Sequence, residues 1–254
     1  MASQTLRIAR RGLIIVDMIT LRLLLAHMLG DYVLQTGRIA QQKTQGWSGL
    51  LWHVSIVTLT SIALTADILP FWGIWSLVLG GLHLAIDQVR AFRARSLPPE
   101  LCCVYLLLDQ SAHVVTICGV AYIAARETPL EAWQQAQQPA TRWLALAILI
   151  IFLIWTTAVL EMEVVRSLRA LHQQVQPAQV LPLDRLFGAV ERLTAVTLFL
   201  SPYPLLYISA FVPRMWWHLR YRLQPGPLLE CEVRALVSAL SATAVGLAIA
   251  FLLG

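Results

Sequence analysis

Long apolar segments recur along the chain, and short polar stretches separate them. Residues 143–160 contain no charged side chain, and residues 235–253 form a second uncharged run that is rich in small residues. Runs of this length can cross the hydrocarbon core of a bilayer as helices, and small residues let such helices pack closely. The pattern predicts a chain that crosses a membrane several times.

The apolar segments and their links predict an all-α, multi-pass transmembrane helical bundle of about seven helices. Proline in the sixth segment, within SPYPLLY, is expected to kink that helix because it removes a backbone hydrogen bond. We expect residues 1–125 to form a four-helix half and residues 126–254 to form a half with about three helices. The predicted helices cover residues 13–36, 48–68, 70–93, 101–125, 140–172, 184–212 and 228–253.

The composition agrees with a membrane protein. Only 13% of the residues are charged and 58% are hydrophobic, whereas soluble domains carry roughly 25% charged residues. The formal net charge of +5 indicates loops that face anionic lipid. Nucleic-acid binding is not expected, because no basic stretch is long or interleaved with aromatic residues. The arginines divide almost evenly between the two sides of the predicted bundle, so they do not decide its orientation.

Aspartate and histidine side chains interrupt four of the apolar segments. In HMLGD, HLAID and DQSAH, a histidine and an aspartate are four residues apart, which places both on one face of a helix. A lone histidine lies in LLWHVSI between the first and second of these motifs. The residues are His27, Asp31, His53, His83, Asp87, Asp109 and His113.

These four groups are predicted to lie at a similar depth in the membrane. The first and third come late in their helices, whereas the second and fourth come early in theirs. If successive helices are antiparallel, all four groups fall near the same membrane face. The sequence therefore predicts one common polar site.

Three interpretations of this site are open: a metal site, a proton or ion relay, and a structural polar network. A charge at the bilayer centre costs at least ~2.5–3.5 kcal/mol, whereas a hydrogen bond between membrane helices contributes only ~0.6 kcal/mol. A divalent cation offsets the charge directly, and zinc accepts imidazole nitrogen and carboxylate oxygen as ligands. We favour a divalent metal, with zinc first, and all seven residues as ligands. Asp31, Asp87 and Asp109 are also the candidate catalytic residues, and Gln35 and Gln110 are expected to orient the ligands.

The motifs resemble those of a family of bacterial multi-pass membrane proteins of unknown function. The family pattern is H-x-x-G-D-x-x-x-Q, then a lone H, then H-x-x-x-D and D-Q-x-x-H. The resemblance implies a protein of the bacterial cytoplasmic membrane. The matching residues are His27, Gly30, Asp31, Gln35, His53, His83, Asp87, Asp109, Gln110 and His113.

The second half of the chain is more loosely similar to longer members of that family. LFGAVERL and ECEVRALVSALS resemble two of their motifs, and an arginine stands where a lysine is expected after the sixth helix. The residues marked by this similarity are Glu191, Arg192, Arg214 and Glu232. Separately, Glu161 and Glu163 are expected to form a solvated helix end with Arg166 and Arg169.

A shorter similarity implies an activity. H-x-x-G-D on a helix also occurs in zinc phospholipase C and single-strand nuclease enzymes, where histidine and aspartate hold metals that hydrolyse phosphoesters. It implies a metal-dependent hydrolase that acts on an anionic lipid or another phosphoester. Two alternatives stay open: an ion or small-molecule transporter component that uses the same residues, and a non-catalytic membrane subunit with a structural metal or polar network.

Overall fold

The protein is an all-α membrane protein, as predicted. The computed structural model describes residues 18–93, 98–127, 139–172, 182–220 and 228–253, and no strand is present among them. Several of the described helices are long and apolar enough to cross a membrane. They cover Trp47–Thr65, Pro99–Arg126, Thr141–Leu171 and Glu230–Leu253.

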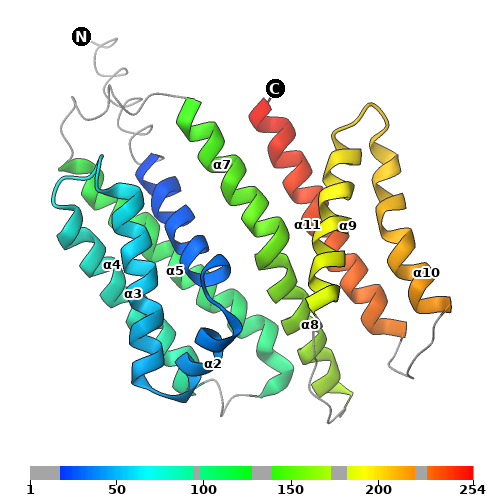
Figure 1. The fold of residues 1–254 in the computed structure, drawn as a ribbon, viewed down its shortest axis with the longest axis horizontal. Coiled ribbons are helices and arrows are strands. Elements are labelled where there is room, and N and C mark those ends of the chain that lie inside the picture. Colours follow the sequence, from blue (N-terminus) through cyan, green and yellow to red (C-terminus); the bar gives the residue numbers. More distant parts are fainter. Residues whose placement is uncertain (1–17, 94–97, 128–138, 173–181, 221–227, 254) are drawn as a thin grey trace. The chain divides into compact units, whose positions relative to one another are not determined.

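The chain forms two compact units, residues 1–97 with 107–148 and residues 98–106 with 149–254. In the first unit, four helices carry the polar motifs. They are the first helix (residues 18–33), which ends in the π-turn η1 (Leu29–Val33), then α3 (Trp47–Thr65), α4 (Trp72–Gln88), which continues into the π-turn η2 (Val89–Arg93), and α5 (Cys102–Arg126). α3 packs against both α4 and the end of the first helix (Figure 1).

The apolar core of this unit continues the helix faces that carry the histidines. Leu23, Leu79 and Ile117 belong to one buried cluster, and each lies four residues from a histidine of the predicted site. The outer faces of the same helices are apolar but exposed, with Leu77 70% and Val115 71% exposed. Apolar residues that face outward on such helices fit a lipid surrounding.

A short helix, α2 (Gly37–Gln45), occupies the link predicted between the first and second membrane segments. Thr36 begins it as an N-cap, because its Oγ1 accepts a hydrogen bond from the Ile39 amide at 3.4 Å. α2 packs against α3 and η2. This packing brings Lys43, in the last turn of α2, to the buried polar groups.

The second unit contains a long helix made of the end of α7 (Pro139–Ile151), η5 (Phe152–Thr156) and α8 (Thr157–Leu171). In this unit, α11 (Leu228–Leu253) packs against both α8 and α9 (Pro182–Phe199). The segment predicted as one kinked helix over 184–212 is instead broken. α9 ends at Phe199, η6 packs against it, and α10 follows (Figure 1). Pro202 and Pro204 lack the amide hydrogens that would continue the helix. The elements are α7 (Pro139–Ile151), η5 (Phe152–Thr156), α8 (Thr157–Leu171), α9 (Pro182–Phe199), η6 (Pro204–Phe211), α10 (Val212–Arg220) and α11 (Leu228–Leu253).

Gly30 sets the close approach of the first helix to α3. A Cβ atom at this position would lie 2.7 Å from Val57 Cγ2 and 3.0 Å from Val57 Cα. Because the second contact is with backbone, α3 as a whole would have to move. Gly81 on α4 provides a contrast, since a Cβ there meets nothing within 4 Å.

Gly30→Ala is expected to lower the thermal unfolding midpoint of the detergent-solubilised protein, because overpacking typically costs about 1–3 kcal/mol. Gly81→Ala, the matched control, should leave the midpoint unchanged or raise it, because alanine favours the helix by up to about 1 kcal/mol. Equal midpoints for the two variants would contradict the close contact.

Candidate metal site

The seven predicted residues lie together inside the first unit, and each is at most 9% exposed. The first helix and α4 each contribute a histidine and the aspartate one turn later, α5 contributes them in the reverse order, and α3 adds one histidine. The structure thus brings together every member of the predicted set. They are His27, Asp31, His53, His83, Asp87, Asp109 and His113.

Two π-turns flank these side chains. η1 contains Asp31, and η2 begins two residues after Asp87 and contains Arg90. A π-turn inserts one extra residue into a helix and so changes the direction in which neighbouring side chains point, and such turns are frequent at functional sites. No sequence pattern indicated either turn.

A tight group of four atoms forms the centre of the site. His53 Nε2 lies 3.0 Å from Asp31 Oδ1, 3.1 Å from Asp87 Oδ2 and 3.2 Å from His83 Nε2. His83 Nε2 lies 3.4 Å from each of the same two carboxylate oxygens. Each Nε2 therefore faces two oxygens and one nitrogen at nearly equal distances.

These distances suit a cation better than hydrogen bonds alone. Each Nε2 carries at most one hydrogen, so the two nitrogens can form hydrogen bonds in at most two of the four N···O contacts. Four ligands that surround a zinc ion tetrahedrally at about 2.0–2.1 Å are separated from one another by about 3.3–3.4 Å. Five separations among these atoms are 3.0 to 3.4 Å, close to that value, and the group of Asp31, His53 and His83 could hold a metal ion.

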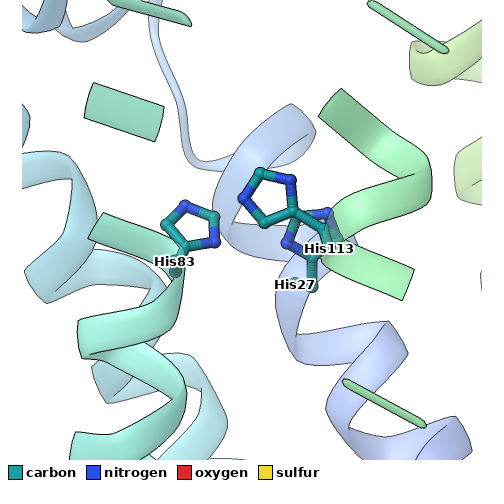
Figure 2. Close-up of side chains that lie close together, drawn as sticks. All are labelled: His27, His83 and His113. Atoms are coloured by element: carbon teal, nitrogen blue, oxygen red, sulfur yellow. The ribbon is translucent and has the colours of Figure 1, made fainter. Parts of the chain in front are cut away.

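A second group consists of three histidine rings. His27, His83 and His113 come from three different helices and gather around one point, as Figure 2 shows. Their ligand atoms lie within 4.8 Å of one another, and the centroids of the His83 and His113 rings are 4.4 Å apart. His113 Nδ1 lies 2.9 Å from the Asp109 main-chain oxygen. This group could also hold a metal ion.

Two cations contact the aspartates, and neither was part of the predicted site. Lys43 Nζ lies 3.0 Å from Asp87 Oδ2, and Arg90 donates to Asp109 Oδ2 at 2.8 Å. Arg90 follows His83 by seven residues and so shares its helix face. This spacing could have predicted that Arg90 lies at the site. Lys43 is the single lysine of an arginine-rich chain. Because it lies in a predicted link between helices, the sequence did not indicate that it contacts the site.

Both predicted glutamines contact the site. Gln35 Oε1 accepts a hydrogen bond from Lys43 at 3.2 Å. Gln110 Oε1 lies 3.3 Å from His27 Nε2, and its Nε2 donates to Asp109 Oδ2 at 3.0 Å. Gln110 therefore contacts a ring and a carboxylate directly, whereas Gln35 acts on Asp87 through Lys43.

The motif residues of the second half form a separate buried ion-pair cluster in the second unit. Arg192 is 0% exposed and donates to Glu161 Oε1 at 2.7 Å and to the carbonyls of Leu153 and Ile154 at 2.6 and 3.0 Å. Both carbonyls belong to the π-turn η5, whose i→i+5 bonding changes the partners of its main-chain groups. Arg214 Nε pairs with Glu191 Oε2 at 2.8 Å.

One expectation about this half is wrong. Glu161 and Glu163 are each only 5% exposed, so they do not form a solvated helix end. Glu161 is buried because its partners, Arg192 and Ser238, come from helices distant in sequence, and the local i, i+3 pattern could not reveal them. Glu232 lies outside the ion-pair cluster and is exposed, whereas Glu230, in the first turn of α11, pairs with Arg169 at 2.8 Å.

The chain belongs to the DUF3307 family of proteins of unknown function, whose model matches residues 19–145. The match spans all seven buried histidines and aspartates as well as Lys43 and Arg90. No curated protein and no solved structure matches the chain.

Arg192→Met is expected to destabilise the protein by about 3–5 kcal/mol, because it leaves the Glu161 carboxylate buried without its guanidinium partner. Thermal unfolding in detergent measures the effect. Adding Glu161→Leu to this variant should recover part of the loss, since no unpaired charge then remains. Arg185→Met is the control, because Arg185 lies on the same helix as Arg192 but is exposed, and exposed charges contribute at most about 1 kcal/mol. Equal effects of Arg192→Met and Arg185→Met would show that the buried pair is not needed.

Proposed function

We propose that this protein is an integral-membrane, metal-dependent hydrolase whose ion is held by Asp31, His53, His83 and Asp87. One observation carries the proposal: buried nitrogen and oxygen atoms from three helices lie 3.0 to 3.4 Å apart in five contacts, close to the spacing of ligands around one ion. Two imidazole nitrogens and two carboxylate oxygens are ligands that zinc accepts, so we propose zinc as the ion.

Charge supports a bound cation. The three buried aspartates carry −3, and Lys43 and Arg90 carry +2, so these five groups sum to −1. One divalent ion changes the sum to +1. Burying a carboxylate without a cation beside it in a membrane protein is costly. Lys43 and Arg90 lie beside Asp87 and Asp109, and a divalent ion would also place a cation beside Asp31 while leaving a positive site.

Hydrolysis requires an activated water and a base. A zinc ion held by these residues would make a water nucleophilic at neutral pH and polarise the ester, since zinc can take a fifth ligand. Asp109 is the base in this proposal, because Arg90 and Gln110 hold its Oδ2 while no hydrogen bond from a described residue reaches its Oδ1. It takes a proton from the water as the water oxygen bonds to phosphorus or to the acyl carbon. Asp109 then passes that proton to the leaving oxygen as the bond from this oxygen to phosphorus or to the acyl carbon breaks.

The cations at the site favour an anionic substrate. Lys43 and Arg90 have side chains 13% and 29% exposed, so both reach solvent beside the buried aspartates. Both can donate to phosphate oxygens. We propose a phosphoester or lipid-like substrate, for an enzyme of the bacterial cytoplasmic membrane.

His53→Ala is expected to remove the bound metal and to abolish hydrolysis, because His53 contacts three of the other ligand atoms. Elemental analysis of the purified protein, with assays on phosphoester and lipid panels, measures both effects. His172→Ala is the control, because His172 is exposed and outside the site, and it should retain metal and activity. Wild-type protein free of metal would contradict the site, and metal without turnover on any panel would indicate a non-catalytic subunit.

Lys43→Ala is expected to raise KM for an anionic phosphoester by roughly 10- to 100-fold, the equivalent of losing one charge-assisted hydrogen bond of about 1.5–3 kcal/mol. An uncharged ester should be affected much less. Arg38→Ala is the control, because Arg38 lies on the same short helix but is exposed. Steady-state kinetics on the two substrates measure the effect. An equal change of both KM values in Lys43→Ala would contradict a role of Lys43 in substrate binding.

A further inference from the structure

We propose that the site binds a second divalent ion through His27, His113 and the carboxylate of Asp31, which bridges the two ions. The inference rests on the proposed function, because it adds a second centre to the same hydrolytic site. It also gives a role to the two histidines that the first ion leaves unused.

The carboxylate of Asp31 faces both groups of ligands. Its Oδ1 lies 3.0 Å from His53 Nε2 and 3.4 Å from His83 Nε2, within the first group. Its Oδ2 is the oxygen that lies 3.7 Å from His27 Nε2. A carboxylate with one oxygen toward each of two ligand groups is suited to bridging two ions about 3.5–4 Å apart, the spacing of two-metal hydrolytic sites.

His27 and His113 have nitrogen atoms available for a ligand. They are 3% and 2% exposed. No hydrogen bond from a described residue reaches His113 Nε2, and His27 turns its Nε2 toward Asp31 Oδ2, where the nitrogen also contacts Gln110 Oε1 at 3.3 Å. The other nitrogen of His113 donates to the Asp109 carbonyl at 2.9 Å, which leaves the lone pair on Nε2. Metal-binding histidines are commonly held in this way, with one ring nitrogen on a carbonyl and the other on the ion.

His83 lies between the two ions. Figure 2 shows its ring facing those of His27 and His113, but its Nε2 is within 3.4 Å of both carboxylate oxygens of the first group. We therefore assign His83 to the first ion. The second ion then has three protein ligands, two imidazoles and the bridging carboxylate.

Three protein ligands leave a fourth position open, as catalytic zinc sites do, whereas four protein ligands close a site. A cavity of about 10 Å³ adjoins the three rings, which is close to the space that one water needs. The second ion would therefore bind a water as its fourth ligand, whereas the first ion would have to take the water as a fifth. The rest of the cavity is lined by Val57, Leu79, Thr116 and Ile117.

The two ions should differ in affinity. Five contacts within the first group are already 3.0 to 3.4 Å, close to the spacing around one ion, whereas the ligand atoms of the histidine group lie within 4.8 Å of one another and must close around the ion. The second ion should therefore bind more weakly and leave first. With it, the charge sum of the aspartates, Lys43, Arg90 and the metals rises from +1 to +3, which favours a phosphate substrate.

The test is a zinc titration of metal-free, full-length protein in detergent, read by elemental analysis after removal of free zinc. We expect wild type to bind two zinc ions per chain, with the weaker one removed first by a chelator. His27→Asn and His113→Asn should each bind only one. Asp31→Asn should bind none or only a weakly held ion, because it removes the bridge. Thr116→Val, which alters the same cavity without removing a ligand, should still bind two.

Cobalt substitution gives a second readout that needs no variant, because two cobalt ions that share a carboxylate are magnetically coupled. Saturation of wild type at one ion, unchanged in His27→Asn and His113→Asn, would overturn the second site. If that protein still hydrolysed phosphoesters, the proposed function would stand without it. Two uncoupled cobalt ions, or one ion retained at full affinity in Asp31→Asn, would overturn the bridge.

Discussion

The first unit depends on the burial of three carboxylates among four imidazoles between helices that expose apolar side chains outward. Neutral imidazoles do not cancel carboxylate charge, and hydrogen bonds between membrane helices are weak. Compensation must come from cations. Lys43 and Arg90 supply part of it, and the close spacing of the ligand atoms around His53 is where a metal would supply the rest.

The grouping of the histidines and aspartates could be predicted because their spacing follows helix periodicity. A histidine and an aspartate four residues apart share a face, and antiparallel helices place such pairs at one depth. Leu23, Leu79 and Ile117 continue the same faces into the core, so the regular part of the fold and the positions of the ligands follow from one pattern.

The parts that sequence reasoning missed depend on tertiary contacts or on breaks in helix geometry. Lys43 reaches Asp87 because a short helix forms where a link was expected. Glu161 is buried because Arg192 and Ser238 arrive from helices distant in sequence. The broken sixth segment shows the limit of the proline rule: proline predicted a disturbance, but not that the chain would turn and pack back on α9.

Lys43 has a consequence for how such a protein is assembled. Its ammonium group provides Asp87 with a counter-ion that is part of the chain itself. The helices can therefore insert and associate with that carboxylate already neutralised, before any ion arrives from outside. If the site takes up a metal, uptake would be a late step that follows assembly of the chain in the membrane.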